Sequence, residues 1–283
     1  MRSISILKAA LGPNARGRKD ATLAAVTRFV NVCLAGEVPT EVRPYFCSAV
    51  LHAVPKRDGN IRPIAVGLLL RRITAKSAVK KLMGKFTQLF SPHQLGCGVR
   101  NGCESIVHAT KLILASHPDR NVLQADYINA YNNIDRSFML EEVKAQVPEL
   151  LNFSMTCYGA ETNLYYGNNV LKSSTGLGQG DPLSSPLYCL TVMPVIMEVD
   201  TRVPDLDLNE WLMDDSTIVG KTEDLKKAMV VMDRWGRRGG CSCRQTRQFL
   251  TGEERALCSA STLVTTRPRN RSDTASRRSA TRG

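Results

Sequence analysis

Residues 211–220 read WLMDDSTIVG and place two adjacent aspartates between two short apolar runs. The flanks have the composition of strands, so the stretch predicts a β-hairpin with Asp214 and Asp215 at its turn. Neighbouring carboxylates repel, and each raises the pKa of the other. A solvated turn accommodates this pair because Asp is a common turn residue. A bound cation also offsets the repulsion, since hard metal ions take carboxylate oxygens. The hairpin alone leaves both interpretations open.

A third carboxylate favours the cation. Asp126 ends the apolar strand NVLQAD, 88 residues before Asp214. Alone it could be a strand-end cap. Between the two strands lies STGLGQGDPLSS, residues 174–185, whose glycines allow the backbone to approach a ligand closely. In this stretch Asp181 and Pro182 predict the start of a helix. Three carboxylates from neighbouring strands suit two Mg²⁺ ions held about 3.5–4 Å apart, with Mn²⁺ as a substitute.

The rest of the chain mixes strands and helices without regular βαβ spacing, which predicts an α+β fold. Apolar periodicity predicts helices at 21–35, 68–86, 103–116, 137–147 and 222–235, and a glycine-rich loop with a long apolar helix at 176–199. In the first of these, Leu23 is expected on the apolar face, and in the second Leu69 and Leu70 are expected inward while Arg71 and Arg72 lie mainly elsewhere. Strands are predicted at 48–56 and 61–67 around Asp58-Gly59, and as a pair around Gly167.

The charge is unevenly distributed. The chain of 283 residues carries a net charge of +12, which suggests a polyanionic partner such as nucleic acid. From Gly236 onward the sequence has eleven arginines, no lysine and three acidic residues, so +8 of the charge belongs to this tail. The tail is rich in Arg, Ser, Thr and Gly and has weak apolar periodicity, so we expect it to be poorly ordered, with at most a short helix near 252–258.

Cysteine usage and hydropathy point to a soluble intracellular protein. The nine cysteines form no C-x-x-C pair, which argues against a zinc ribbon. The set His93, Cys97, Cys103 and His108 matches no common zinc spacing. The longest apolar run, residues 188–197, is too short to cross a membrane.

At this point the sequence resembles a known family. NVLQADYINAYNNIDR, GLGQGDPLSS and LMDD, in this order and spacing, resemble the three core palm motifs of reverse transcriptases. VPKRDGNIRPIAVGLLLRRITAK and HQLGCGVRNGCES resemble the fingers of the non-LTR, LINE-like retrotransposon branch. The resemblance implies a right-hand polymerase fold with fingers and palm, acting on an RNA template with a DNA primer and deoxynucleoside triphosphates. A nuclear location follows by family analogy, no membrane is implied, and the oligomeric state stays open.

The resemblance also implies a role for each matching residue. Asp126 and Asp214 would be metal ligands, with Asp215 as the supporting carboxylate. The backbone at Tyr127 and Ile128 would run past the triphosphate, and Tyr131 would be the steric gate that excludes a 2′-hydroxyl. The remaining implied nucleotide contacts are Gln179, Gly180, Lys56 and Arg62. Without the resemblance, Lys56 and Arg62 would be taken as solvated hairpin charges.

The sequence divides into an N-terminal segment (1–20), a fingers-like region (21–120), a palm (121–235) and the basic tail (236–283). The tail lacks the family's usual GL-x-x-N-x-x-K stretch, so no thumb is expected, and a shifted reading frame or a decayed element would explain the difference. Two functions therefore stay open: an RNA-directed DNA polymerase core, or a non-catalytic palm-fold remnant that binds nucleic acid. A cyclic-nucleotide synthase is disfavoured because no GGDEF-like stretch occurs.

Overall fold

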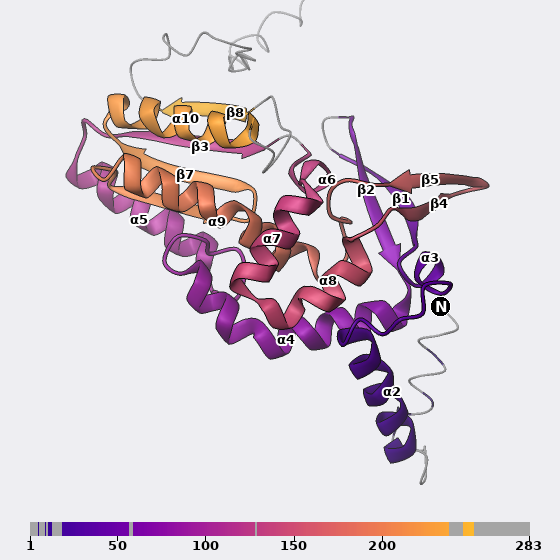
Figure 1. Ribbon diagram of the computed structural model, residues 1–283. Coiled ribbons are helices and arrows are strands. Elements are labelled where there is room, and N and C mark those ends of the chain that lie inside the picture. The colour runs from indigo at the N-terminus through magenta and orange to yellow at the C-terminus, as the bar shows by residue number, and fades with distance from the viewer. Residues whose placement is uncertain are drawn as a thin grey trace, which may run out of the picture.

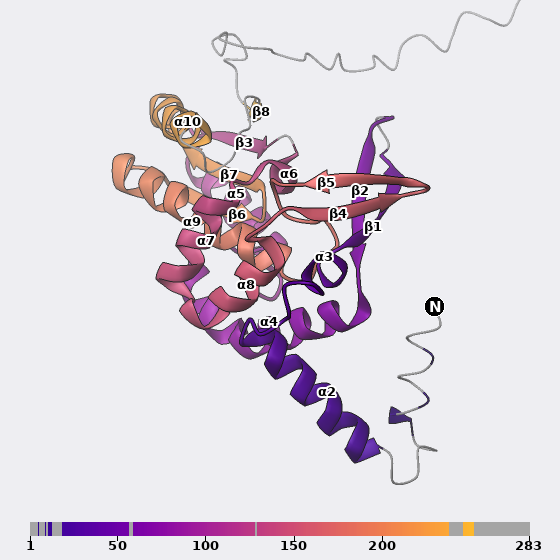
Figure 2. The same cartoon turned by 45° about the vertical axis from the view of Figure 1, so that its right-hand side comes forward.

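The computed structural model describes residues 19–56, 59–127, 129–237 and 246–251, together with residues 5, 9, 11 and 12 near the N-terminus. Of Asp126, Arg237 and residues 246–251 it describes the backbone only. Two four-stranded sheets form the frame, and α6 (Ala130–Asn133) lies between them in both ribbon views (Figures 1 and 2). Helix α2 (Lys19–Leu34) runs away from both sheets.

The first sheet, which we call the hairpin sheet, has the order β2-β1-β4-β5. Its strands are β1 (Ala49–Pro55), β2 (Ile61–Gly67), β4 (Thr162–Tyr166) and β5 (Asn169–Ser173). Both predicted hairpins are present, and the glycines at their tips have positive φ, +84° at Gly59 and +57° at Gly167. Strand β4 pairs in parallel with β1, so segments on either side of residue 120 share this sheet.

The second sheet, the carboxylate sheet, has the order β6-β7-β3-β8. Its strands are β6 (Leu208–Leu212), β7 (Asp215–Gly220), β3 (Asn121–Tyr127) and β8 (Thr246–Thr251). Every described pairing in this sheet is antiparallel, which fits the α+β class expected from the sequence. Within the region predicted to be poorly ordered, residues 246–251 form β8, which extends the sheet along β3. The predicted helix near 252–258 lies outside the described residues.

Alternation along these strands produces one buried face and an opposite face that is open only toward the carboxylate end, since Val122 and Val219 on that face are also buried. On the buried face, Leu123, Tyr127, Trp211 and Ile218 are at most 3% exposed. Tyr127 stacks on Trp211 with ring centroids 6.1 Å apart and meets Trp235 of α10 (Thr222–Arg237) edge-on. On the opposite face, Gln124 and Asp215 are exposed. The core therefore packs against one face of the sheet and leaves the carboxylate end of the other face accessible.

The other helices surround the two sheets. They are α3 (Arg43–Phe46), α4 (Leu69–Phe90), α5 (Gly102–Ser116), α7 (Arg136–Gln146), the short 3₁₀ helix η1 (Pro148–Leu150), α8 (Leu151–Tyr158) and α9 (Ser184–Arg202). Helix α9 is the most buried of these, because apolar residues occupy nearly its whole circumference. Among the described helices none is both long enough and apolar enough to span a bilayer.

Three residues on α2 and α4 lie on a different side of their helix from the one predicted. Leu23 of α2 is exposed, and so is Leu70 of α4. Arg71, expected away from the core, is buried.

In the second half of α4 the predicted face is correct, since Phe86 is buried and Leu82 and Met83 pack against the core. In its first half the small residues Ala75 and Ala78 let neighbouring elements approach, so these and not the leucines at its start face inward.

Candidate functional site

Three aspartates meet at one end of the carboxylate sheet. Asp126 in β3 and Asp215 in β7 are directly opposite each other in the antiparallel register. Asp214 precedes Asp215 in the two-residue connection between β6 and β7, residues 213 and 214, which we call the carboxylate turn. Asp215 thus begins a strand, a correction to its predicted place in the turn. Asp214 is half-buried and Asp215 is exposed.

This donor set fits a hard divalent cation. Opposed residues of an antiparallel pair have Cα atoms about 4.5–5.5 Å apart, so Asp126 and Asp215 lie within reach of a shared ion. Carboxylate oxygens are the ligands that Mg²⁺ prefers. Among the described side chains, which do not include that of Asp126, no group of three or more His, Cys, Asp or Glu residues is close enough to share a metal ion.

Tyr131 lies beside the carboxylate turn. It follows β3 on α6 and stacks on Tyr188 of α9, with ring centroids 4.7 Å apart. Its hydroxyl approaches Sδ of Met213 at 3.4 Å. Burial is the main reason that the pKa of Tyr131 is raised, so the phenol stays neutral. The side chain of Tyr127 is in the core, so only its backbone is available to a ligand, and Ile128 lies outside the described residues.

The glycine-rich loop, residues 174–183, connects β5 to α9 and contacts both β2 and the segment around α6. Gly176 has φ +68°, and a Cβ there would lie 2.2 Å from the carbonyl oxygen of Asn132, so no larger residue fits. The amide of Ala65 in β2 donates to the carbonyl of Gln179 at 2.8 Å. The Gln179 side chain donates to Oδ1 of Asn132 at 2.9 Å. The loop therefore lies between the free edge of β2 and the segment that carries Tyr131, with Gly180 exposed.

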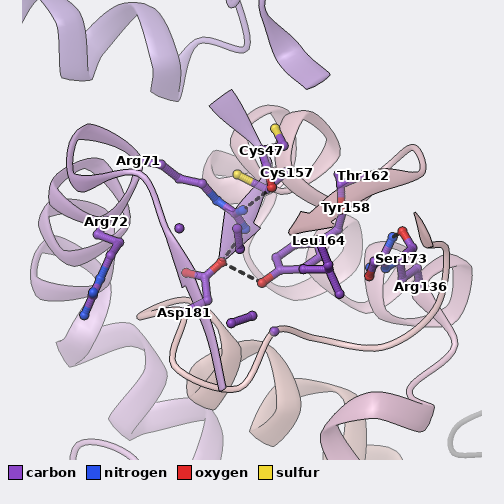
Figure 3. Close-up of a pocket in the computed structure, with 14 residues that line it drawn as sticks. Cys47, Arg71, Arg72, Arg136, Cys157, Tyr158, Thr162, Leu164, Ser173 and Asp181 are labelled. Atoms are coloured by element: carbon purple, nitrogen blue, oxygen red, sulfur yellow. Dashed lines mark hydrogen bonds and ion pairs between the residues drawn. The ribbon is translucent and has the colours of Figure 1, made fainter. Parts of the chain in front are cut away.

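Asp181 is not the helix cap predicted from the sequence. Helix α9 begins three residues later, at Ser184. The Asp181 carboxylate accepts from the amide of Leu183 at 3.1 Å, but it is also buried in an ion pair with Arg71 of α4. Tyr158 of α8 donates at 2.7 Å to the carboxylate oxygen that Arg71 contacts. Figure 3 shows the three side chains converging on a small cavity, while Arg72 points away. The preference for an N-cap is outweighed because a buried guanidinium requires an anion.

The electrostatics of this group follow from burial and pairing. Burial acts to lower the pKa of Arg71, but the neighbouring Asp181 carboxylate and other groups outweigh it, so the net pKa is raised and Arg71 stays charged. The pKa of Tyr158 is raised, first by burial and then by Asp181. Sequence reasoning did not identify this group. Its only signal was an arginine inside an otherwise apolar helix face, which a solvated charge explains equally well.

Lys56 and Arg62 lie on the hairpin of β1 and β2. Val54 is opposite Arg62 in the register, and Lys56 is two residues beyond Val54, so both cations are on one face. Both are exposed. Ile64 shares this face, and its Cγ2 lies 3.2 Å from where a Cβ on Gly180 would be. The cations are thus on the side of the hairpin that borders the glycine-rich loop.

Comparison with known proteins agrees with this arrangement. The profile of the family described as reverse transcriptase (RNA-dependent DNA polymerase) matches residues 54–248, more than half of the chain. Among solved structures, telomerase from Candida albicans, in complex with the TWJ fragment of telomeric RNA, is similar with a TM-score of 0.57 and 12% identity, over 77% of this chain and 44% of that chain. Apo telomerase from Candida tropicalis, truncated from its C-terminal domain, is similar with a TM-score of 0.53 and 15% identity, over 75% and 52% of the two chains.

No curated protein sequence matches the chain significantly. The chain spans about half the length of the telomerase structures it resembles. At this level of identity the likeness shows the fold, which is the right-hand polymerase fold with fingers and palm, as predicted from the sequence. In the part of the chain that the structure describes, the single strand β8 is the one element after α10, so the described residues include no thumb helix there.

Proposed function

The chain belongs to the reverse transcriptase (RNA-dependent DNA polymerase) family, and from this premise we propose that it adds deoxynucleotides to a primer 3′-hydroxyl on an RNA template. The observation that carries the proposal is the register of β3 against β7, which brings Asp126 opposite Asp215 and next to Asp214 on the open face of the sheet. In this proposal the region 21–120 forms mainly the fingers and 121–235 mainly the palm, although β4 and β5 of the second region belong to the hairpin sheet.

In this proposal the three carboxylates hold the metal ions at the place where the primer hydroxyl and the triphosphate would meet. Asp126 and Asp214 bind two Mg²⁺ ions and Asp215 supports them. The bound ions would supply neutralisation of charge on the attacking and leaving oxygens, the main requirement of phosphoryl transfer. The turn connects β6 and β7, and the burial of Trp211 and Ser216 beside it restrains the backbone that carries Asp214.

The surrounding residues select and orient the nucleotide. Tyr131, stacked on Tyr188, presents a rigid ring at the sugar and excludes a 2′-hydroxyl. Gln179 and Gly180 line the pocket between template base and nucleotide, and the backbone at 127 and 128 borders the triphosphate. Lys56 and Arg62 meet the triphosphate from the hairpin: Arg as a bidentate donor and Lys as a point charge.

The motifs VPKRDGNIRPIAVG and HQLGCGVRNGCES support placement in the non-LTR retrotransposon branch, whose members act in the nucleus. The telomerases named above are a second branch of similar fold.

Primer extension on poly(rA)/oligo(dT) with Mg²⁺ tests the proposal. Asp126→Asn and Asp214→Asn should each abolish extension, because an amide binds a divalent cation far more weakly than a carboxylate does. Asp233→Asn, an exposed change on α10, is the matched control and should retain activity. Extension at the wild-type rate in either site variant would disprove the assignment. A wild-type protein that is folded, binds RNA and extends nothing with Mg²⁺ or Mn²⁺ would establish the non-catalytic remnant instead.

A further inference from the structure

Gln94 lies in the loop between α4 and α5, and its side chain is fully buried against the carboxylate turn. Its amide nitrogen donates to the carbonyl of Met213 at 3.0 Å. Its amide oxygen accepts from the N–H of the same residue at 2.8 Å. The side chain thus pairs with Met213 as a neighbouring strand would, although the two residues are 119 positions apart.

Met213 needs such support because its backbone is strained. Its φ is +60°, in the left-handed region that a side chain with a Cβ rarely adopts. Such a conformation persists only where the surroundings impose it, and it is common at functional sites. Met213 is the residue immediately before Asp214, so the orientation of this peptide determines where the Asp214 carboxylate points.

The segment around Gln94 packs closely against the carboxylate turn. The amide of Leu95 donates to the carbonyl of Trp211 at 2.7 Å, and the amide of Trp211 donates to the carbonyl of His93 at the same distance. Gly96 donates its own amide to Gln94 Oε1 at 3.0 Å. A Cβ on Gly96 would lie 2.5 Å from the backbone nitrogen of Met213, so this position has no room for a side chain.

We propose that Gln94 is a positioning residue for catalysis: it fixes the left-handed Met213 peptide and thereby holds Asp214 in its metal-binding orientation. This inference rests on the proposed function for the role of Asp214. It follows from the two hydrogen bonds by which the Gln94 side-chain amide, through its nitrogen and its Oε1, holds the backbone of Met213. The remaining contact of Oε1, with Gly96, keeps the amide from rotating away. The residue acts through Met213 and need not touch substrate.

The test uses the full chain with Gln94→Met, which keeps the length and apolar volume of the side chain and removes both hydrogen bonds with Met213 and the one from Gly96. Gln88→Met, on the exposed side of α4, is the matched control. The first measurement is amide exchange at Met213 by NMR with selective ¹⁵N-methionine labelling. Because the N–H of Met213 loses its acceptor, we expect exchange about tenfold faster in Gln94→Met and unchanged exchange in Gln88→Met.

The second measurement separates kcat from KM in primer extension. Loss of two hydrogen bonds predicts a kcat about 30-fold lower, with KM for the nucleotide changed by less than about twofold. A general loss of folding would instead reduce the active fraction and the melting temperature together, so thermal unfolding is recorded in parallel. The third measurement is Mn²⁺ affinity by electron paramagnetic resonance, which should fall in Gln94→Met because Asp214 is no longer held in place.

The outcomes are distinct. Unchanged Met213 exchange, or faster exchange with wild-type kcat and Mn²⁺ affinity, overturns the inference. If the wild type extends no primer, the proposed function fails, and exchange together with Mn²⁺ affinity then decides the role of Gln94. If Gln94→Met does not fold, Gln94→Glu replaces it, because Glu keeps the accepting oxygen and lacks the amide donor. Protected Met213 with reduced kcat in that variant supports the inference, and wild-type kcat overturns it.

Discussion

Replacement of Arg71 by Met should destabilise the protein more than any other single charge deletion on α4. The side chains of Arg71 and Asp181 are 7% and 8% exposed, and their ion pair joins α4 to the glycine-rich loop. Arg71 also donates to the carbonyl of Cys47 at 2.8 Å. Removal of the guanidinium leaves a buried carboxylate with Tyr158 and the amide of Leu183 as its remaining donors, and a carbonyl without this donor.

The expected cost is about 3–5 kcal/mol, the range for removing one partner of a buried ion pair. Lys76→Met, an exposed change on the same helix, should cost within about 0.5 kcal/mol and serves as the control. Asp181→Asn should cost a similar amount to Arg71→Met, because it leaves the guanidinium buried without its anion. The double variant should cost less than the sum of the two, with a coupling free energy of about 2 kcal/mol.

Urea unfolding measures these differences. The two tryptophans, Trp211 and Trp235, are both buried behind the carboxylate sheet, so their fluorescence reports on the palm core. Each of the four variants in the cycle is measured, and free energies of unfolding are compared at a common slope. A coupling free energy below about 0.5 kcal/mol would refute the argument, because the pair would then contribute no more than an exposed ion pair does.

Three further predictions test other parts of the structure. Tyr131→Val should admit ribonucleotides, because the ring stacked on Tyr188 no longer fills the space of a 2′-hydroxyl; unchanged discrimination between dATP and ATP in primer extension would contradict the gate. Burial raises the pKa of Glu210 above its value in the unfolded chain, so the free energy of unfolding falls as pH rises from the unfolded pKa through the folded pKa. Glu210→Gln should therefore raise the melting temperature by about 2 °C near neutral pH and leave it unchanged in acid. Equal effects at both pH values would argue against this. Burial raises the pKa of the Cys97 thiol to about 11, so iodoacetamide should label exposed Cys103 first, and faster labelling of Cys97 in peptide mass spectra would contradict its burial.

Local pattern predicted many of the elements, although α3, α8 and β8 were not among the predicted ones. Alternating apolar residues around Asp58-Gly59 and Gly167 predicted both hairpins of the first sheet, and the apolar run before Asp126 predicted β3. These predictions succeed because strand, turn and helix preferences depend on neighbours within a few residues. The ordered motifs predicted the family, and the matching profile over residues 54–248 confirms it.

Orientation of the helices was less predictable. Leu23 and Leu70 are exposed, and Arg71 is inside, because the direction of a helix face depends on what packs against it. The pairing of β4 with β1 and the addition of β8 beside β3 are contacts between distant segments, so composition alone gave no sign of them. The arginine-rich composition around β8 in particular favoured disorder.

The sequence by itself determined which residue types are present for the chemistry: three aspartates, a tyrosine five positions after the first of them, and a glycine-rich loop in the order of a reverse transcriptase. Only the tertiary structure decided their surroundings. It placed Asp126 opposite Asp215, buried Asp181 with Arg71, and set Gln94 against Met213. The physical reason is that hydrogen bonds and ion pairs between distant segments depend on burial and distance in space, and neither is encoded in the local pattern of a chain.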